Sequence, residues 1–145
     1  MSHYEDLVCD ATEIWDQFPM MSKEGLIGLV KSREQQMAIA IDIFIGQVLN
    51  GGFDQWTANG YAQPMYRCVI DAFQKIDTAH SNAAIDLIHR AGRITDYFDD
   101  CGEATESALD KLDTKFYAFS DELTKEVTAW FEQFAPQLVE SGYSI

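Results

Sequence analysis

A row of acidic side chains near the C-terminus has the spacing to do chemistry. Its five members are separated by 4, 3, 4 and 3 residues: Asp99, Glu103, Glu106, Asp110 and Asp113. On an α-helix this spacing puts the carboxylates on one face, about 5 Å apart along the axis. The chemistry that such a row offers is ionic attraction of a cationic partner. The row is therefore a candidate protein-binding surface, with a merely solvated helix face as the alternative.

The distribution of charge along the chain favours a basic partner. The 145 residues include 24 acidic and 10 basic side chains, a net charge of −14. Residues 1–22 hold five acids and no base, residues 23–95 hold seven of each, and residues 96–145 hold twelve acids and three bases. The first segment adds three candidate acids, Asp6, Asp10 and Glu13. Binding to nucleic acid or to an anionic membrane is disfavoured, because either needs a basic footprint.

Residues that support catalysis or metal binding lack the required spacing. No HExxH motif or Cys/His set occurs, and no histidine has a metal-ligating partner four residues away. The cysteines, Cys9, Cys68 and Cys101, form no C-x-x-C pair and are typical of reduced thiols in a cytosol. No apolar run approaches the roughly 20 residues of a membrane span. We therefore expect a cytoplasmic protein with no catalytic residue, no metal and no cofactor.

Helical periodicity defines the elements that must position these residues. Apolar side chains recur every three or four residues, with capping boxes at Ser2-x-x-Glu5 and Ser32-x-x-Gln35 and caps at Ser22, Ser81 and Ser120. The sequence predicts an all-α fold over residues 1–145, a compact single-domain helical bundle of about six to seven helices with short connections. Its expected core includes seven large side chains: Trp15, Phe44, Phe53, Phe73, Phe116, Trp130 and Phe131.

Residues 50–55, here called the corner, end the helix expected from Ser32 to about Leu49. Gly51 is predicted to take the left-handed conformation that terminates a helix, and Gly52 to let the chain turn closely. Phe53 and Trp56 would then return to the core. A phosphate-binding loop fits poorly, because neither G-x-x-x-x-G-K-[ST] nor G-x-G-x-x-G is present. The corner is therefore predicted to be structural.

The string NGGFDQW resembles the NGGF-x-Q signature of the DNA-mimic-protein family, which it matches at Asn50, Gly51, Gly52, Phe53 and Gln55. The later segment LDKLDTKFYAFSDELTKEVTAWFEQFAPQLV is similar to that family's terminal pattern of Leu-Asp, Phe-Tyr, a helix, then an aromatic residue and Pro. The resemblance covers about residues 35–139. It implies an all-helical domain without known catalysis, whose named member competes with DNA for a DNA-binding protein. It implies no ligand or catalytic role for the five matching positions.

These observations predict a non-enzymatic, acidic protein-binding module, monomeric or homodimeric. Its expected partner is a basic protein, such as a transcription factor whose DNA-binding surface the acids would occupy. Two alternatives stay open: an immunity-type inhibitor that plugs the basic active site of a toxin such as a nuclease, and an enzyme with an unmarked pocket. The complete set of candidate partner-binding residues is Asp6, Asp10, Glu13, Asp99, Glu103, Glu106, Asp110 and Asp113.

Overall fold

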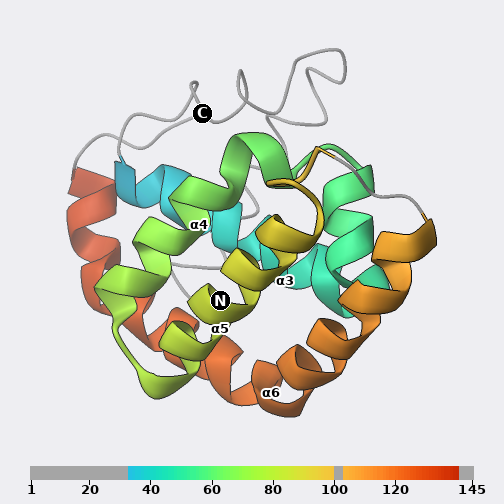
Figure 1. Ribbon diagram of the computed structural model, residues 1–145. Helices are drawn as coiled ribbons and strands as arrows, with labels where there is room; N and C mark the ends of the chain where they lie inside the picture. Colours follow the sequence, from blue (N-terminus) through green and yellow to red (C-terminus); the bar gives the residue numbers. More distant parts are fainter. Residues whose placement is uncertain (1–32, 100–102, 141–145) are drawn as a thin grey trace.

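The computed structural model describes residues 33–99 and 103–140, which form four helices. In chain order these are α3 (Arg33–Ala58), α4 (Ala62–Ile76), α5 (Ala79–Ile94) and α6 (Glu103–Glu140) (Figure 1). The all-α prediction is confirmed, since no strand occurs in these two ranges. They contain four helices rather than the six to seven expected, and the helices predicted to follow Ser2 and Ser22 lie outside them.

Helix α6 is continuous where the sequence predicted two helices. Ser120 was expected to cap a separate last helix, but its hydroxyl donates a hydrogen bond to the Tyr117 carbonyl oxygen, 3.3 Å away, within α6. A serine inside a helix can bond back to the preceding turn in this way without ending the helix. The apolar stripes before and after Ser120 therefore form one buried face. In Figure 1 α6 curves along the bottom of the bundle, and it contacts α3, α4 and α5.

The N-cap of helix α5 lies three residues before the predicted cap, Ser81. Thr78 is the N-cap, and its side-chain oxygen accepts a hydrogen bond from the Ser81 N–H at 3.0 Å. In return the Thr78 N–H donates to the Ser81 hydroxyl oxygen at 2.8 Å. Ser81 is thus the third helical residue of a capping box, a place where Glu or Gln is usual. Pro64 falls in the first turn of α4, where a proline is tolerated.

Aromatic rings from three helices meet at the centre of the core. Phe44 of α3 lies 4.7 Å from Trp56, 5.5 Å from Phe116 of α6 and 5.9 Å from Phe73 of α4, measured between ring centroids. The five predicted core residues Phe44, Phe53, Phe73, Phe116 and Phe131 are fully buried. Trp130 is only partly buried, and Trp15 lies outside the described residues. The core thus joins both ends of α3 to α4 and α6.

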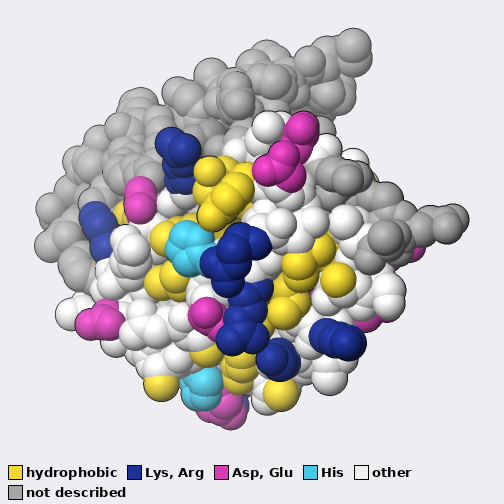
Figure 2. Space-filling model, viewed as in Figure 1, with side chains coloured by type: hydrophobic (Ala, Val, Ile, Leu, Met, Phe, Trp, Pro, Cys, Tyr) yellow, Lys and Arg dark blue, Asp and Glu magenta, His cyan; other side chains and the backbone are white. Residues whose placement is uncertain are grey.

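Charge is segregated between the helices. Together α4 and α5 carry four basic residues and two acidic ones, whereas α6 carries nine acidic residues and three lysines. Figure 2 shows Lys and Arg side chains gathered in the middle of the face that α5 occupies. Among the described helices, the acid excess is therefore concentrated on α6.

Candidate protein-binding site

The corner is a break inside α3. Two residues there leave the helical conformation, Gly51 with φ −152° and ψ 15° and Gly52 with φ 80° and ψ −177°. The combination at Gly52 lies in a region that only glycine occupies readily. The prediction of a positive φ at Gly51 is therefore wrong, because the positive φ occurs at the next residue, Gly52. The helix resumes after the break, so that Phe53 and Trp56 point into the core as expected.

Two side chains of α6 satisfy the backbone groups at the two sides of the break. The Phe53 N–H donates a hydrogen bond to Asp113 Oδ1 at 2.9 Å, in the manner of an N-cap. The Tyr117 hydroxyl donates to the Val48 carbonyl oxygen, also at 2.9 Å. Since Asp113 and Tyr117 are one helical turn apart, a single face of α6 holds both halves of α3. The Leu-Asp and Phe-Tyr pairs at 112–113 and 116–117 thus have a structural reason.

Both glycines of the corner are needed for close packing. A Cβ atom at Gly52 would lie 2.1 Å from Asp113 Oδ2, and one at Gly51 would lie 2.0 Å from Gln55 Oε1. Gln55 accepts a hydrogen bond from the Asn50 side-chain amide at 3.1 Å and donates one to Gln47 Oε1 at 3.1 Å. The amides therefore bridge the break on its outer side. Of the matching positions of the NGGF-x-Q string, Asn50, Phe53 and Gln55 make hydrogen bonds at the break, and the two glycines leave room for them.

Asp113 does not face solvent, which corrects the prediction for this member of the row. Its side chain is only 8% exposed, and its carboxylate is directed at the corner. Burial raises its pKa, the Phe53 N–H lowers it, and the nearby carboxylates of Asp110 and Asp54 raise it further, so that the net shift is upward. Spacing alone placed Asp113 on the acidic face, but it lies at the edge of that face and turns inward.

The other predicted acids are distributed over three parts of the chain. Glu106 and Asp110 are exposed on α6, as expected. Glu103 is the first residue of α6, and the structure does not describe its side chain. Asp99 is exposed but lies in the turn after α5, so it does not continue the helical row. Asp6, Asp10 and Glu13 are outside the described residues.

One exposed acid on the same flank of α6 escaped the sequence analysis. Asp121 lies eleven residues after Asp110, which is close to three helical turns, and it is exposed. Its signal was the i, i+11 spacing, which the interruption by Asp113 and Tyr117 concealed. We call Glu106, Asp110 and Asp121 the exposed row. No ion pair to any of the three is present within the described ranges.

Two other exposed acids pair with cationic neighbours. Asp86 pairs with Arg90 at 3.0 Å, and Glu122 lies 3.7 Å from the Lys125 ammonium. Pairing with a neighbour offsets part of the field that a carboxylate presents to a partner. The exposed row therefore differs from these acids by its uncompensated charge, as well as by its alignment.

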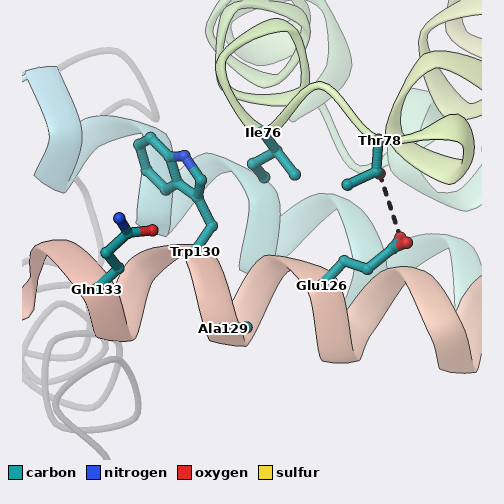
Figure 3. A pocket seen from close by; sticks show the side chains of 6 residues that line it. All are labelled: Ile76, Thr78, Glu126, Ala129, Trp130 and Gln133. Atoms are coloured by element: carbon teal, nitrogen blue, oxygen red, sulfur yellow. Dashed lines mark hydrogen bonds between the residues drawn. The ribbon is translucent and has the colours of Figure 1, made fainter.

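A pocket lies on the side of α6 that carries Glu126, away from the exposed row. It measures about 280 Å³ and is lined by Ile76, Thr78, Glu126, Ala129, Trp130 and Gln133 (Figure 3). Thr78 Oγ1 donates to the Glu126 carboxylate at 3.2 Å, and His80 Nδ1 lies 3.1 Å from the same group. Glu126 thus fastens the start of α5 to α6. Within the described residues, no group of three or more His, Cys, Asp or Glu side chains could hold a metal ion.

The comparison with known families agrees with the resemblance that rests on the NGGF-x-Q string. Residues 31–134 match the family described as DMP19-like protein. The chain belongs to this DNA-mimic family. No curated protein and no solved structure matched it. The DMP19-like region includes the corner, both capping side chains and the exposed row, whereas Asp6, Asp10 and Glu13 precede it. Within the described residues, no helix is long and apolar enough to cross a membrane.

Proposed function

We propose that this DMP19-like protein is a non-enzymatic binding module whose exposed row occupies the DNA-binding surface of a basic protein, such as a transcription factor. The observation that carries the proposal is the exposed row, whose three carboxylates have no ion pair among the described residues, on the helix with nine acids and three lysines. Family membership supports the same function. Carboxylates that already face solvent need little further desolvation at the rim of an interface, where they mainly accelerate association.

The spacing of the row indicates how DNA would be imitated. Glu106 and Asp121 are 15 residues apart, which is about 22 Å along a helix axis. The phosphates of one DNA strand follow one another about every 3.4 Å along the duplex axis. Three carboxylates over that length do not reproduce phosphates one for one. The imitation is therefore of the negative field along a rod, and basic side chains of the partner adjust to it.

A charge-matched pair of triple variants tests the proposal. The row variant combines Glu106→Gln, Asp110→Asn and Asp121→Asn. The control variant combines Asp77→Asn, Asp86→Asn and Asp96→Asn, three exposed acids that lie outside α6. Both change the net charge by three units, and Asn tolerates the left-handed backbone of Asp77 and Asp96.

The assay begins by capturing basic proteins from the source cell at low salt and selecting those that bind DNA. Association rates with the purified partner are then measured at a series of salt concentrations between 0.05 and 1 M. Over this range the Debye length falls from about 14 to about 3 Å. We expect the row variant to associate more slowly, to depend less on salt and to compete less well with DNA. Equal slowing by the control variant would show that only net charge matters and would refute the assignment of the row.

A further inference from the structure

Exposed apolar side chains mark the part of α6 where the exposed row is interrupted. In the described part of the chain three large hydrophobic residues are exposed: Leu49 at 47%, Tyr97 at 44% and Tyr117 at 44%. Two of them lie together at the corner, because the Tyr117 hydroxyl binds the carbonyl of the peptide that joins Val48 to Leu49. Tyrosine is one of the side chains that are enriched at protein interfaces.

Tyr117 lies among the acids of the exposed row. Asp110 is seven residues before it and Asp121 four residues after it, so the three share one flank of α6. Burial raises the pKa of Tyr117, and the carboxylates of Asp113 and Asp110 raise it further. The hydroxyl bond to Val48 holds the ring in one orientation. The ring is thus fixed before any partner binds.

We propose that the exposed face of the Tyr117 ring stacks on the guanidinium group of an arginine in the basic partner, flanked by the carboxylates of Asp110 and Asp121. Leu49 then contacts the aliphatic stem of the same side chain. This inference rests on the proposed function and names the anchoring contact within it. A planar guanidinium stacks on an aromatic ring while its edges bond to carboxylates, which a compact ammonium does less well.

The anchor and the row have separable effects on binding. Charges at the rim mainly change the association rate and its salt dependence. A stacked aromatic contact at the centre mainly changes the dissociation rate. The preference for arginine over lysine therefore depends on the ring, whereas the general attraction of cations depends on the row.

Two peptides of equal charge, nona-arginine and nona-lysine, provide the probes. Their affinities for the full chain are measured by fluorescence anisotropy at low salt. Tyr117→Leu removes the ring, and Tyr117→Phe keeps the ring but loses the bond to Val48. Tyr97→Leu is the matched control, because Tyr97 is equally exposed but lies in the turn after α5 and not on α6. Circular dichroism confirms that each variant is folded.

We expect Tyr117→Leu to weaken nona-arginine binding by roughly 2- to 30-fold, the range of a cation–π contact. Nona-lysine binding should change less, Tyr117→Phe should retain most of the arginine preference, and Tyr97→Leu should leave both affinities unchanged. The inference is overturned if wild-type protein binds the two peptides equally or not at all. It is also overturned if Tyr97→Leu or Tyr117→Phe loses as much as Tyr117→Leu.

The triple row variant separates this failure from failure of the proposed function. If that variant weakens both peptides while Tyr117→Leu has no effect, the row binds cations and Tyr117 is no anchor. If Tyr117→Leu removes the arginine preference while the row variant and its charge-matched control behave alike, the anchor stands and the row does not.

Discussion

Replacing Gly52 with alanine tests whether the corner is fastened by α6. The added Cβ would lie 2.1 Å from Asp113 Oδ2 and 2.7 Å from its Cγ, so the carboxylate must move. Moving it breaks the 2.9 Å hydrogen bond from the Phe53 N–H. The substitution also forces an L-residue into φ 80°, ψ −177°. Two separate costs are therefore expected, one from backbone strain and one from the lost cap.

The magnitude follows from these two costs. Holding a non-glycine residue in this region costs about 1–3 kcal/mol. Leaving a buried N–H without its acceptor costs about another 1–3 kcal/mol. Gly52→Ala should therefore lower the free energy of unfolding by about 2–6 kcal/mol. In a protein that already carries Asp113→Ala the clash and the cap are gone, so only the strain of about 1–3 kcal/mol should remain.

Urea denaturation of the two single variants and the double variant gives the coupling free energy. We expect a coupling of about 1–3 kcal/mol, equal to the cap that both substitutions remove. Gly60→Ala is the matched control, because Gly60 also has a positive φ, 82°, but no atom lies within 4 Å of an added Cβ. Additive effects of Gly52→Ala and Asp113→Ala, or a larger loss from Gly60→Ala, would refute the reasoning.

Three further substitutions follow from the same contacts. Gly46→Ala should stabilise the protein by about 0.5–1 kcal/mol, because this position is inside α3 and no atom within 4 Å opposes a Cβ; thermal melting checks it. Phe44→Ala should cost about 3–5 kcal/mol in urea denaturation, since the ring is fully buried, and a cost below about 1 kcal/mol would contradict its central place. Asp113→Asn should be more stable than wild type at pH 7, because it keeps the acceptor and removes a charge whose pKa is raised on folding. A raised pKa means that stability is lost as pH rises through the folded value, so the advantage of Asn should shrink as pH falls and vanish below about 3.8. An advantage that is constant with pH would contradict this origin.

The helices and the core could be predicted because their signals are local. Apolar periodicity identified the buried faces on which Phe44, Phe73 and Phe116 lie. The boundary at Ser120 could not be predicted, because a serine with good capping chemistry can equally bond back inside a helix. Two apolar stripes in phase are compatible with one continuous helix as well as with two helices separated at Ser120. Only the packing of α6 against α3, α4 and α5 distinguishes these two possibilities.

The acidic site could be predicted only in part, because the contacts that define it join residues far apart in the sequence. Residue spacing shows which side chains share one face of a helix. It does not show whether a side chain at the boundary of that face points to solvent or to a neighbouring helix. The Asp113 carboxylate accepts a hydrogen bond from the Phe53 N–H, 60 residues away in the sequence. No local sequence pattern predicts a contact between residues so far apart. Asp121 was missed because the same edge position interrupted the row. The exposed row and the structural acid therefore separate only once α3 and α6 are side by side.

One flank of α6 thus serves the fold and carries the proposed partner surface. Asp113 and Tyr117 hold the break in α3, while Asp110 and Asp121 on the same flank stay unpaired and exposed. Because the break presents its outer peptide to Tyr117, the corner fixes the orientation of the ring that lies among the exposed acids. Substitutions in the corner should then act mainly on stability, since Tyr117→Phe is expected to keep most of the arginine preference, whereas substitutions in the exposed row should change attraction without changing stability. The contacts of the NGGF-x-Q string are structural, and one of them reaches the helix flank that carries the exposed row.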